Sequence, residues 1–384
     1  MSKRRVLVCG CGIAGLTAAH ALTKDGHEVT LVERVEAFDA IGAGIVLQAN
    51  ALASLDALGI GERVRAAGHR PSNGGILSAN GDAIVRFDAS QMAQHPTVAD
   101  TFAFYRPDLH DALAAGLDVQ TYLGTTVREF DDSGHVLLSD GTALDVDLLV
   151  GADGIHSTVR AQLNVSARTV YAGYTCWRVV CENRIGLEEV LEVWGRGKRV
   201  GLVPLTKNRI YAFLVADAPP GGHDDPAADA QAILGELFGE FDGKAGEFVR
   251  SLRDDFLMRH DINEHDSIEW GRGVAVLIGD AAHAMTPNMG QGAAQSIEDA
   301  VALALVLRDQ AADVPAALRA ARDRRVRAIK SQSRRVGAVA QWHNPVACWA
   351  RNTLARGVPN ALAGIERMLE PGITQAKSYM QDIR

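Results

Sequence analysis

Short apolar runs alternate with amphipathic, helix-like stretches along most of the chain, and turn residues separate them. The pattern is clearest at the start, where an apolar strand at residues 6–9 leads through a glycine-rich turn into a helix-like run at residues 14–22. A second strand follows at residues 27–32. Alternation of strands with helices is typical of sheets with parallel strands. We therefore predict an α/β protein that begins with a Rossmann-like unit.

Two later segments repeat the order of strand, turn and helix. A buried-type strand at residues 148–151 leads through a turn into a helical start at Ser157. An apolar strand at residues 274–278 precedes a helical run at residues 293–307. The chain thus has three strand-to-helix turns, and each of them is rich in glycine.

The first turn reads GCGIAG and has the spacing of a dinucleotide-binding fingerprint. Gly10 makes the tight turn, Gly12 lets the backbone approach a pyrophosphate, and Gly15 allows the helix to pack closely on the strand. The first helical residues, Ile13 and Ala14, offer free N–H groups to the phosphates. The motif predicts a nucleotide cofactor at this turn.

The second strand ends in Glu33, 18 residues after Gly15. A carboxylate there can accept hydrogen bonds from an adenosine ribose and would repel a 2′-phosphate, which favours FAD or NAD over NADP. A rival interpretation is a secretory signal peptide, because basic residues 3–5 precede a charge-poor run at residues 6–23. We do not favour it, since the glycines would break the apolar helix that a signal needs.

The second turn, GADGIHSTVR, is a weak signal by itself, because a turn such as Asp153-Gly154 occurs in many α/β proteins. The third, GDAAHAMTPNMGQG, is more specific. Asp280 can accept hydrogen bonds from ribityl hydroxyls, and Pro287 makes the loop rigid. The following helix would aim N–H groups and its positive dipole end at a flavin pyrimidine ring. For His283, a place beside the phosphates or packed in the turn is favoured over a role as catalytic base.

Length and composition limit the number of domains and the kinds of molecule that the protein can bind. The chain has 384 residues, more than one core usually supports, so we expect two domains or one domain with an insertion. Lys and Arg number 39 against 47 Asp and Glu, and the net charge of -8 argues against nucleic acid. The five cysteines lack zinc-ligand spacing, which predicts a cytoplasmic protein with reduced thiols and no metal. We expect no membrane-spanning segment.

Two features near the C-terminus allow more than one interpretation. The Arg- and Lys-rich run at residues 319–335 is interpreted as the solvated face of a helix rather than a polyanion site. Residues 336–358 are more apolar and include Trp342 and Trp349. They could contact a membrane or line a substrate entrance, but core packing of a C-terminal helix pair is favoured.

The three motifs, together with YRPDLHDAL around Arg106, resemble the group A flavoprotein aromatic hydroxylases over nearly the whole chain. In this family, which includes 4-hydroxybenzoate and salicylate hydroxylases, the first motif binds the ADP part of FAD. The second touches FAD and NAD(P)H, and the third holds the ribityl chain. Arg106 would lie near the ribityl chain and the phosphates, and Arg34 near the adenosine. The implied cofactor contacts are Gly10, Gly12, Ile13, Ala14, Gly15, Glu33, Arg34, Arg106, Asp153, Gly154, Asp280, Pro287, Gly290, Gln291, Gly292 and Ala293.

The same resemblance implies a fold like that of 4-hydroxybenzoate hydroxylase, with a Rossmann-like FAD-binding domain and an inserted β-sheet substrate domain. Short β-rich runs between the motifs suit a sheet that lies over the flavin. The expected divisions are a discontinuous FAD-binding domain at 1–72, 98–166 and 266–335, a substrate domain at 73–97 and 167–265, and a C-terminal helical segment at 336–384.

Within the family, YAGYTCWRVV and WGRGKRVGLVPL look most like urate hydroxylases and 2-alkyl-4-quinolone 3-hydroxylases. The tail QWHNPVACWARNTLARGVPN looks closer to the quinolone enzymes. Arg199 and Tyr211 match substrate-site residues and are our candidates for catalysis, Arg199 to stabilise an anionic substrate and Tyr211 to relay its proton. The alternative is that both residues pack or close a sheet-edge salt bridge.

The resemblance implies a monooxygenase in which NADH or NADPH reduces FAD, O₂ adds at flavin C4a, and the hydroperoxide hydroxylates an electron-rich aromatic or N-heteroaromatic ring. A 2-alkyl-4-quinolone is the favoured substrate. The alternatives are a urate or salicylate-type hydroxylase, a plain NAD dehydrogenase, a flavin reductase or cyclase, and a binding protein on the same scaffold. The sequence does not show whether the electron donor is NADH or NADPH, or whether the protein is a monomer or a homodimer.

Overall fold

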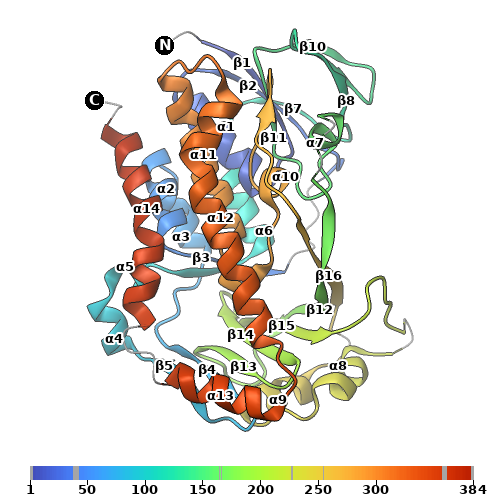
Figure 1. Ribbon diagram of the computed structural model, residues 1–384, viewed down its shortest axis with the longest axis vertical. Helices are drawn as coiled ribbons and strands as arrows, with labels where there is room; N and C mark the ends of the chain where they lie inside the picture. The colour runs from blue at the N-terminus through green and yellow to red at the C-terminus, as the bar shows by residue number, and fades with distance from the viewer. Residues whose placement is uncertain are drawn as a thin grey trace.

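The computed structural model describes residues 3–37, 43–163, 165, 167–225, 228–253, 255–356 and 361–381. Two large sheets lie at opposite ends of an elongated molecule, and the long helix α12 (Val314–Ala340) runs between them (Figure 1). The sheet at the N-terminal end contains the strands that precede the three glycine motifs. The α/β fold class predicted from the sequence is confirmed.

The first sheet has six strands, and all its neighbours except one pair are parallel. The strands in the middle of this sheet are almost fully buried, as expected for parallel strands that helices cover, whereas the two edge strands are more exposed. Helices α1 (Ile13–Lys24) and α11 (Gly292–Arg308) pack against each other beside it. In spatial order its strands are β17 (Gly271–Arg272), β18 (Ala275–Leu277), β11 (Leu148–Gly151), β1 (Arg5–Cys9), β2 (Glu28–Val32) and β7 (Gln120–Tyr122).

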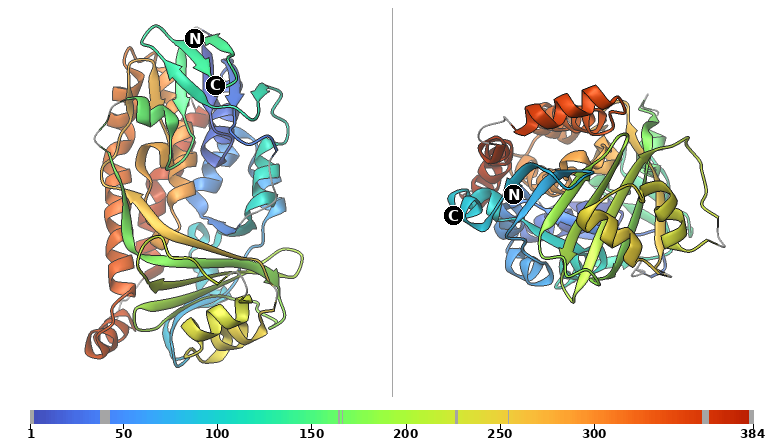
Figure 2. Two further views of the ribbon diagram at one scale, coloured as in Figure 1. Left: turned by 90° about the vertical axis from the view of Figure 1, so that its right-hand side faces the viewer. Right: turned by 90° about the horizontal axis from the view of Figure 1, so that it is seen from below.

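The second large sheet has seven strands and is mainly antiparallel. Helices α8 (Ala230–Phe238) and α9 (Gly243–Ser251) cover its outer face, where Trp177, Phe238 and Phe248 form part of a separate core. Figure 2 shows these helices on the far side of the sheet from α1 and α11. In spatial order the strands are β16 (Leu257–His265), β12 (Thr169–Glu182), β15 (Arg209–Asp217), β14 (Lys198–Leu205), β13 (Val190–Trp194), β4 (Gly74–Ser78) and β5 (Ala83–Phe87).

Smaller elements complete the described part of the chain. Strands β8 (Val127–Phe130), β9 (His135–Leu138) and β10 (Ala143–Asp145) form a three-stranded sheet, and β3 (Gly44–Leu47) pairs with β6 (Phe102–Tyr105). The remaining helices are α2 (Ala49–Leu58), α3 (Gly61–Ala67), α4 (Ala89–Gln94), α5 (Pro96–Ala99), α6 (Arg106–Ala114), α7 (Thr158–Gln162), α10 (Asp280–His283), the 3-10 helix η1 (Pro287–Met289), α13 (Pro345–Arg356) and α14 (Ala361–Gln381).

The arginine-rich run corrects one prediction. Arg322 is 1% exposed, and its guanidinium contacts Glu298 at 2.6 Å and Asp299 at 2.8 Å, both on α11. Arg325 also pairs with Glu298, and Lys330 pairs with Glu264 on β16. The solvated-face interpretation was therefore wrong for these three cations, because buried carboxylates from other elements meet them. Helix α12 also continues past residue 335, where the predicted domain boundary lies.

The favoured core packing of the C-terminal helix pair is wrong for both tryptophans. Trp342 is 40% exposed and Trp349, on α13, is 68% exposed. The buried side of α13 instead carries Cys348 and Arg351, whose guanidinium lies 5.0 Å from the centre of the Trp194 ring. Helix α14 packs against α2 and α11 (Figure 1). Of the helices in the described ranges, none has the length and apolar character needed to cross a bilayer.

Candidate active site

The three glycine turns lie side by side although they are far apart in sequence. Strand β1 pairs with β11 in register Cys9 with Gly151, and β11 pairs with β18 in register Gly151 with Leu277. All three strands are parallel, so their carboxyl ends meet at one edge of the sheet, where ligands bind in α/β folds. The sheet topology therefore brings the three predicted cofactor motifs together.

The first turn is shaped for close approach of a ligand. Gly10 has φ 97°, and a Cβ at this position would lie 2.6 Å from the carbonyl oxygen of Ala152 in the second motif. A Cβ at Gly15 would lie 1.8 Å from the carbonyl oxygen of Gly10, which explains the close packing of α1 on the turn. At Gly12 the space is open, and no side chain caps α1. The first N–H groups of the helix thus face a gap that suits an anion.

Glu33, Arg34 and Arg106 lie around this turn. The Glu33 carboxylate accepts a hydrogen bond from the backbone N–H of Cys11 at 2.7 Å, while Arg34 is exposed. Arg106 begins α6, and the ring of His110, one turn further along the same helix face, lies 2.9 Å from the carbonyl oxygen of Cys11. Arg106 therefore lies beside the first turn.

In the second motif, one oxygen of Asp153 binds the start of α7. It accepts hydrogen bonds from the Thr158 backbone at 2.7 Å and from the Thr158 hydroxyl at 3.0 Å. The other oxygen, Oδ1, is buried without a partner in the described structure. A buried acceptor of this kind calls for a hydrogen-bond donor, and the ligand hydroxyls expected at this edge of the sheet are of that type. Open space also lies in front of Gly154.

The third motif places Asp280 at the start of α10. Its carboxylate is accessible to solvent, yet the surrounding protein raises its pKa, and the charges of His283, Arg106 and Lys330 oppose that rise. A side chain that is both accessible and surrounded by protein lies in a cleft. The charge of Arg106 acts on Asp280, so these two predicted cofactor contacts lie within electrostatic range of each other.

The rest of the third motif forms the loop that begins α11. Pro287 starts η1, Gly290 ends it with φ 62°, and no side chain caps α11. Space is open at Gly292, and Ala293 follows in the first turn of the helix. The Gln291 side chain is directed into the protein. It is 1% exposed and bonds to Gln48 and Asn50, so it fixes the loop and leaves only its backbone free to meet a cofactor.

His283 is buried and does not face the cleft. Its ring lies 2.6 Å from Asp299, which also accepts the backbone N–H of Gly279 at 3.0 Å. This arrangement agrees with a histidine packed in the turn. Across the described ranges, no group of His, Cys, Asp and Glu side chains is placed to hold a metal ion.

The inner face of the seven-stranded sheet lies toward the third glycine motif, which it contacts through Arg199. Arg199 and Tyr211 point to this face, on neighbouring strands β14 and β15. Arg199 is 3% exposed, pairs with Glu192 at 3.3 Å and donates a hydrogen bond to Asn288 in η1. It therefore links the sheet to the third glycine motif.

Tyr211 is nearly buried against the dinucleotide-binding part of the molecule. A Cβ at Gly44 on β3 would lie 2.2 Å from its ring, so the tyrosine packs directly on that backbone. Burial raises the pKa of Tyr211 to about 12, although the charge of Arg178 opposes the rise. The phenol is therefore protonated at neutral pH. Ion pairing by Arg199 and packing by Tyr211 are both present, as the alternative interpretation anticipated.

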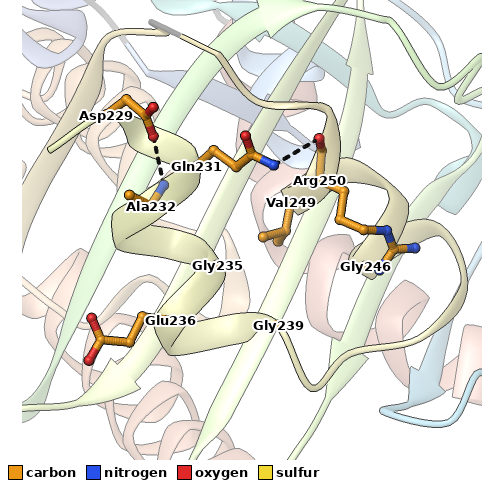
Figure 3. A pocket seen from close by; sticks show the side chains of 9 residues that line it. All are labelled: Asp229, Gln231, Ala232, Gly235, Glu236, Gly239, Gly246, Val249 and Arg250. Atoms are coloured by element: carbon orange, nitrogen blue, oxygen red, sulfur yellow. Dashed lines mark hydrogen bonds between the residues drawn. The ribbon is translucent and has the colours of Figure 1, made fainter.

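A depression between α8 and α9 lies on the opposite face of the same sheet (Figure 3). Its lining includes Asp229, which caps α8 by accepting the Ala232 N–H at 2.7 Å, and Gln231, which bonds to the Arg250 carbonyl at 3.4 Å. These polar groups satisfy the ends of the two helices, and the sheet separates them from the glycine turns. We assign no chemistry to this depression.

One family model, described as an FAD binding domain, matches residues 3–334. The chain belongs to this family. The geometry fits such a cofactor. The uncapped start of α1 suits a pyrophosphate, the Glu33 carboxylate lies beside the first glycine turn, and Asp280 offers a carboxylate to hydroxyl groups.

Relatives that match over most of their length show which enzymes of the family the chain resembles. It is 40% identical over 361 residues to a Stigmatella aurantiaca protein named aurachin C monooxygenase/isomerase, covering 91% of this chain and 93% of the relative. It is 37% identical over 366 residues to the 2-heptyl-3-hydroxy-4(1H)-quinolone synthase of Pseudomonas aeruginosa, covering 93% and 94%. The structure of Klebsiella pneumoniae HpxO with FAD and uric acid superposes with a TM-score of 0.83 at 27% identity, covering 97% of both chains.

These likenesses confirm the predicted FAD cofactor and the predicted class, an FAD-dependent monooxygenase of aromatic rings. The individual contacts to FAD and the catalytic roles of Arg199 and Tyr211 stay predictions. So do the domain boundaries, the electron donor, the oligomeric state and the cytoplasmic location.

Two polar residues on the inner face of the sheet, Arg178 on β12 and His260 on β16, were not predicted from the sequence. Arg178 pairs in register with Phe213, and His260 pairs with Cys176. Alternation along WRVV would have placed Arg178 on the opposite face from the buried Trp177. His260 gave no comparable signal, because its face depends on the pairing of β16 with β12.

A buried histidine that contacts the second motif should make the stability of the protein depend on pH. The buried ring of His265 contacts the Arg160 guanidinium and lies 3.1 Å from the Ile155 carbonyl. Burial lowers its pKa from 6.5 to about 4, so the folded protein disfavours the protonated ring. The stability contributed by the neutral ring is complete above pH 6.5 and is lost as the pH falls toward 4. We expect His265 alone to lower the free energy of unfolding by about 2 kcal/mol when the pH falls from 7 to 5.

Urea unfolding of the wild type and of His265→Asn at both pH values tests this expectation. The variant should be less stable at pH 7 but should lose less stability on acidification. Other histidines contribute equally to both proteins, so the comparison isolates His265. An identical loss in both proteins would show that His265 does not couple folding to protonation.

Proposed function

We propose that the protein hydroxylates the ring of a 2-alkyl-4(1H)-quinolone at position 3, using FAD, O₂ and NADH or NADPH. The observation that carries the proposal is the near full-length similarity to the 2-heptyl-3-hydroxy-4(1H)-quinolone synthase. A monooxygenase that forms that product would start from 2-heptyl-4(1H)-quinolone. The aurachin C monooxygenase/isomerase is similar to this chain over the same span.

The inner face of the sheet supports an aromatic, partly apolar substrate. Val203, Leu205 and Tyr211 form an apolar cluster there, and Tyr105 and Phe213 pack against it. A Cβ at Gly201 would lie 1.9 Å from the Phe213 ring, so the glycine gives this ring room to lie across β14. The partly exposed rings of Tyr105 and Phe213 at the margin of this cluster would offer an apolar surface to a flat ring with an alkyl chain.

Residues at the glycine turns would hold the cofactor. The N–H groups at the start of α1 would bind the pyrophosphate, Glu33 the ribose, and Asp280 the ribityl chain. The positive end of the α11 dipole would stabilise negative charge on the pyrimidine ring of the reduced flavin. Bound FAD, once reduced, supplies the oxygen-activating chemistry. The protein would orient the substrate ring and keep water away from it.

A purified enzyme incubated with NADH or NADPH and a panel of 2-heptyl-4(1H)-quinolone, urate, salicylate and 4-hydroxybenzoate tests this function. The proposal expects quinolone-stimulated NAD(P)H oxidation, matching O₂ uptake, and a product heavier by one oxygen. Bound FAD with no response to the quinolone, together with turnover of another ring, would reject the quinolone assignment.

A urate-type substrate is the second candidate. The structural similarity to HpxO in complex with uric acid favours it. The substrate panel separates the two candidates.

Replacing Arg199 by Met should impair hydroxylation while FAD stays bound. The change removes the buried contacts to Glu192 and Asn288, and with them the link between the sheet and the loop before α11. We expect kcat/KM to fall on the order of 10- to 100-fold. Product formation and flavin absorbance of the purified variant are the measurements.

Lys198→Met is the matched control. Lys198 is the adjacent residue of β14, but its side chain pairs with Glu240 and not with Glu192 or Asn288. It should retain wild-type turnover. Unchanged turnover in Arg199→Met with the true substrate would remove Arg199 from the mechanism.

A further inference from the structure

The inner face of the sheet carries an arginine that has no acidic partner among the described residues. Arg178 lies on β12, two residues from Cys176 and opposite Phe213 on β15. Its side chain is half-buried. Burial disfavours its charge, and the groups that favour the charge are Cys176 and Tyr211, with a hydrogen bond to the Tyr211 hydroxyl. No carboxylate within the described ranges pairs with it. A half-buried guanidinium with only a neutral phenol as its partner is suited to bind an anion.

His260 lies on the adjacent strand and on the same face. It pairs in register with Cys176, while its neighbour Arg259 points to the outer face and lies over the Trp177 ring. His260 is accessible to solvent. Its pKa is nevertheless lowered from 6.5, first by the surrounding protein and then by the charges of Arg178 and Arg106. The ring is therefore neutral at pH 7 and able to accept a proton.

The inner face of the sheet, which carries this pair, contacts the third glycine motif, because Arg199 on this face donates a hydrogen bond to Asn288 in η1. Arg106, which begins α6, acts electrostatically on both His260 and Asp280. Asp280 is the predicted ribityl contact of the third glycine motif. The inner face of the sheet and the predicted cofactor edge therefore lie next to each other, and we place the substrate ring between them.

We propose that His260 and Arg178 form the acid–base and anion-binding pair for the substrate, with Tyr211 as the positioning residue that orients Arg178. His260 accepts the proton from the ring N–H or O–H of the substrate. The N–H or O–H bond breaks, a new N–H bond forms on the imidazole, and the electron pair stays on the substrate. Arg178 donates hydrogen bonds to the oxygen that carries the resulting negative charge. Deprotonation makes the ring richer in electrons and so more reactive toward electrophilic oxygen.

This inference rests on the proposed function and names residues of the same site. The chemistry is shared by a quinolone, a phenol and a purine, since each has an acidic N–H or O–H conjugated with the ring. A binding test that needs no turnover can therefore examine the roles of His260 and Arg178 without knowledge of the true substrate.

The first test uses 4-nitrophenol as a probe, because its anion absorbs visible light and the neutral phenol does not. Wild-type holoenzyme should bind it as the anion at a pH below the pKa of the free phenol. Arg178→Met should lose this shift, with affinity for the anion about 10-fold weaker or more. Arg178→Lys should recover part of it. A wild-type protein that leaves the probe neutral contradicts the inference, whichever ring the enzyme hydroxylates.

The second test measures single-turnover hydroxylation in His260→Ala. The rate should fall on the order of 100-fold while the substrate Kd changes little. Added imidazole should restore part of the rate, which a merely structural defect would not allow. His135→Gln, on β9, and Arg86→Met, at the far edge of the sheet, are controls of the same residue types, and both should behave like the wild type.

The outcomes distinguish the two claims. Quinolone turnover that is unchanged in His260→Ala and Arg178→Met overturns the pair and leaves the proposed function standing. No quinolone turnover, but an anionic probe that Arg178→Met releases, rejects the quinolone as substrate and supports the pair. A slow His260→Ala that imidazole does not rescue also counts against proton transfer by His260.

Discussion

An aspartate in place of Gly12 is expected to prevent FAD binding while the protein stays folded. A Cβ at Gly12 meets no atom within 4 Å, and the residue has φ -74°, so the backbone accepts a side chain. Aspartate is also a preferred N-cap, so α1 should not be weakened. The new carboxylate would occupy the place of the pyrophosphate and repel it. We expect FAD affinity to fall at least about 100-fold.

Flavin absorbance after purification, and titration of the apoprotein with FAD, measure this loss. Gly235→Asp is a matched control, since Gly235 on α8 also has open space at its Cβ position and lies on the outer side of the seven-stranded sheet. It should retain FAD. A yellow Gly12→Asp protein with wild-type affinity would mean that the cofactor does not lie against α1.

Replacing Arg322 by Met should destabilise the protein strongly. Arg322 is buried between Glu298 and Asp299, each of which is also buried. Burial raises the pKa of Glu298, and the nearby arginines more than reverse this, so the carboxylate is charged in the folded state. Removing one partner leaves an uncompensated buried charge, which costs about 3–5 kcal/mol. Urea unfolding at neutral pH measures the change.

Arg327→Met on the same helix is the control, because Arg327 forms an exposed pair with Asp323 and should contribute under about 1 kcal/mol. FAD retention provides a second readout for Arg322→Met. Arg322 contacts Glu298, which bonds to Asn50 on α2, and Gln295, which bonds to Gln291 at the start of α11. A variant as stable as Arg327→Met would show that the buried cluster is not required for the fold.

Local sequence rules were sufficient for the strands and helices around the glycine turns. The run at residues 6–9 became β1, and the run at residues 293–307 became the centre of α11. Strong apolar periodicity, glycines at fixed spacing and a short path from strand to helix all act within about 20 residues. Assembly of the three turns at one sheet edge followed from the parallel pairing of their strands.

Contacts that depend on distant partners could not be predicted in this way. The periodicity of residues 319–335 shows a charged helix, but whether Arg322 meets water or Glu298 depends on how α12 packs on α11. In the same way, the sequence does not show that the Gln291 side chain bonds to Asn50 on α2, and its contact with the cofactor stays a prediction. His260 was missed because strand register, rather than its local sequence, places it opposite Cys176.

The most direct test of the proposed function is a turnover of 2-heptyl-4(1H)-quinolone by the holoenzyme with NADH or NADPH under isotopically heavy O₂. The proposal predicts a 3-hydroxylated quinolone that carries one heavy oxygen atom, formed in step with NAD(P)H oxidation. A product without the label, or NAD(P)H oxidation that yields only hydrogen peroxide, would contradict the assignment of this protein as a quinolone hydroxylase.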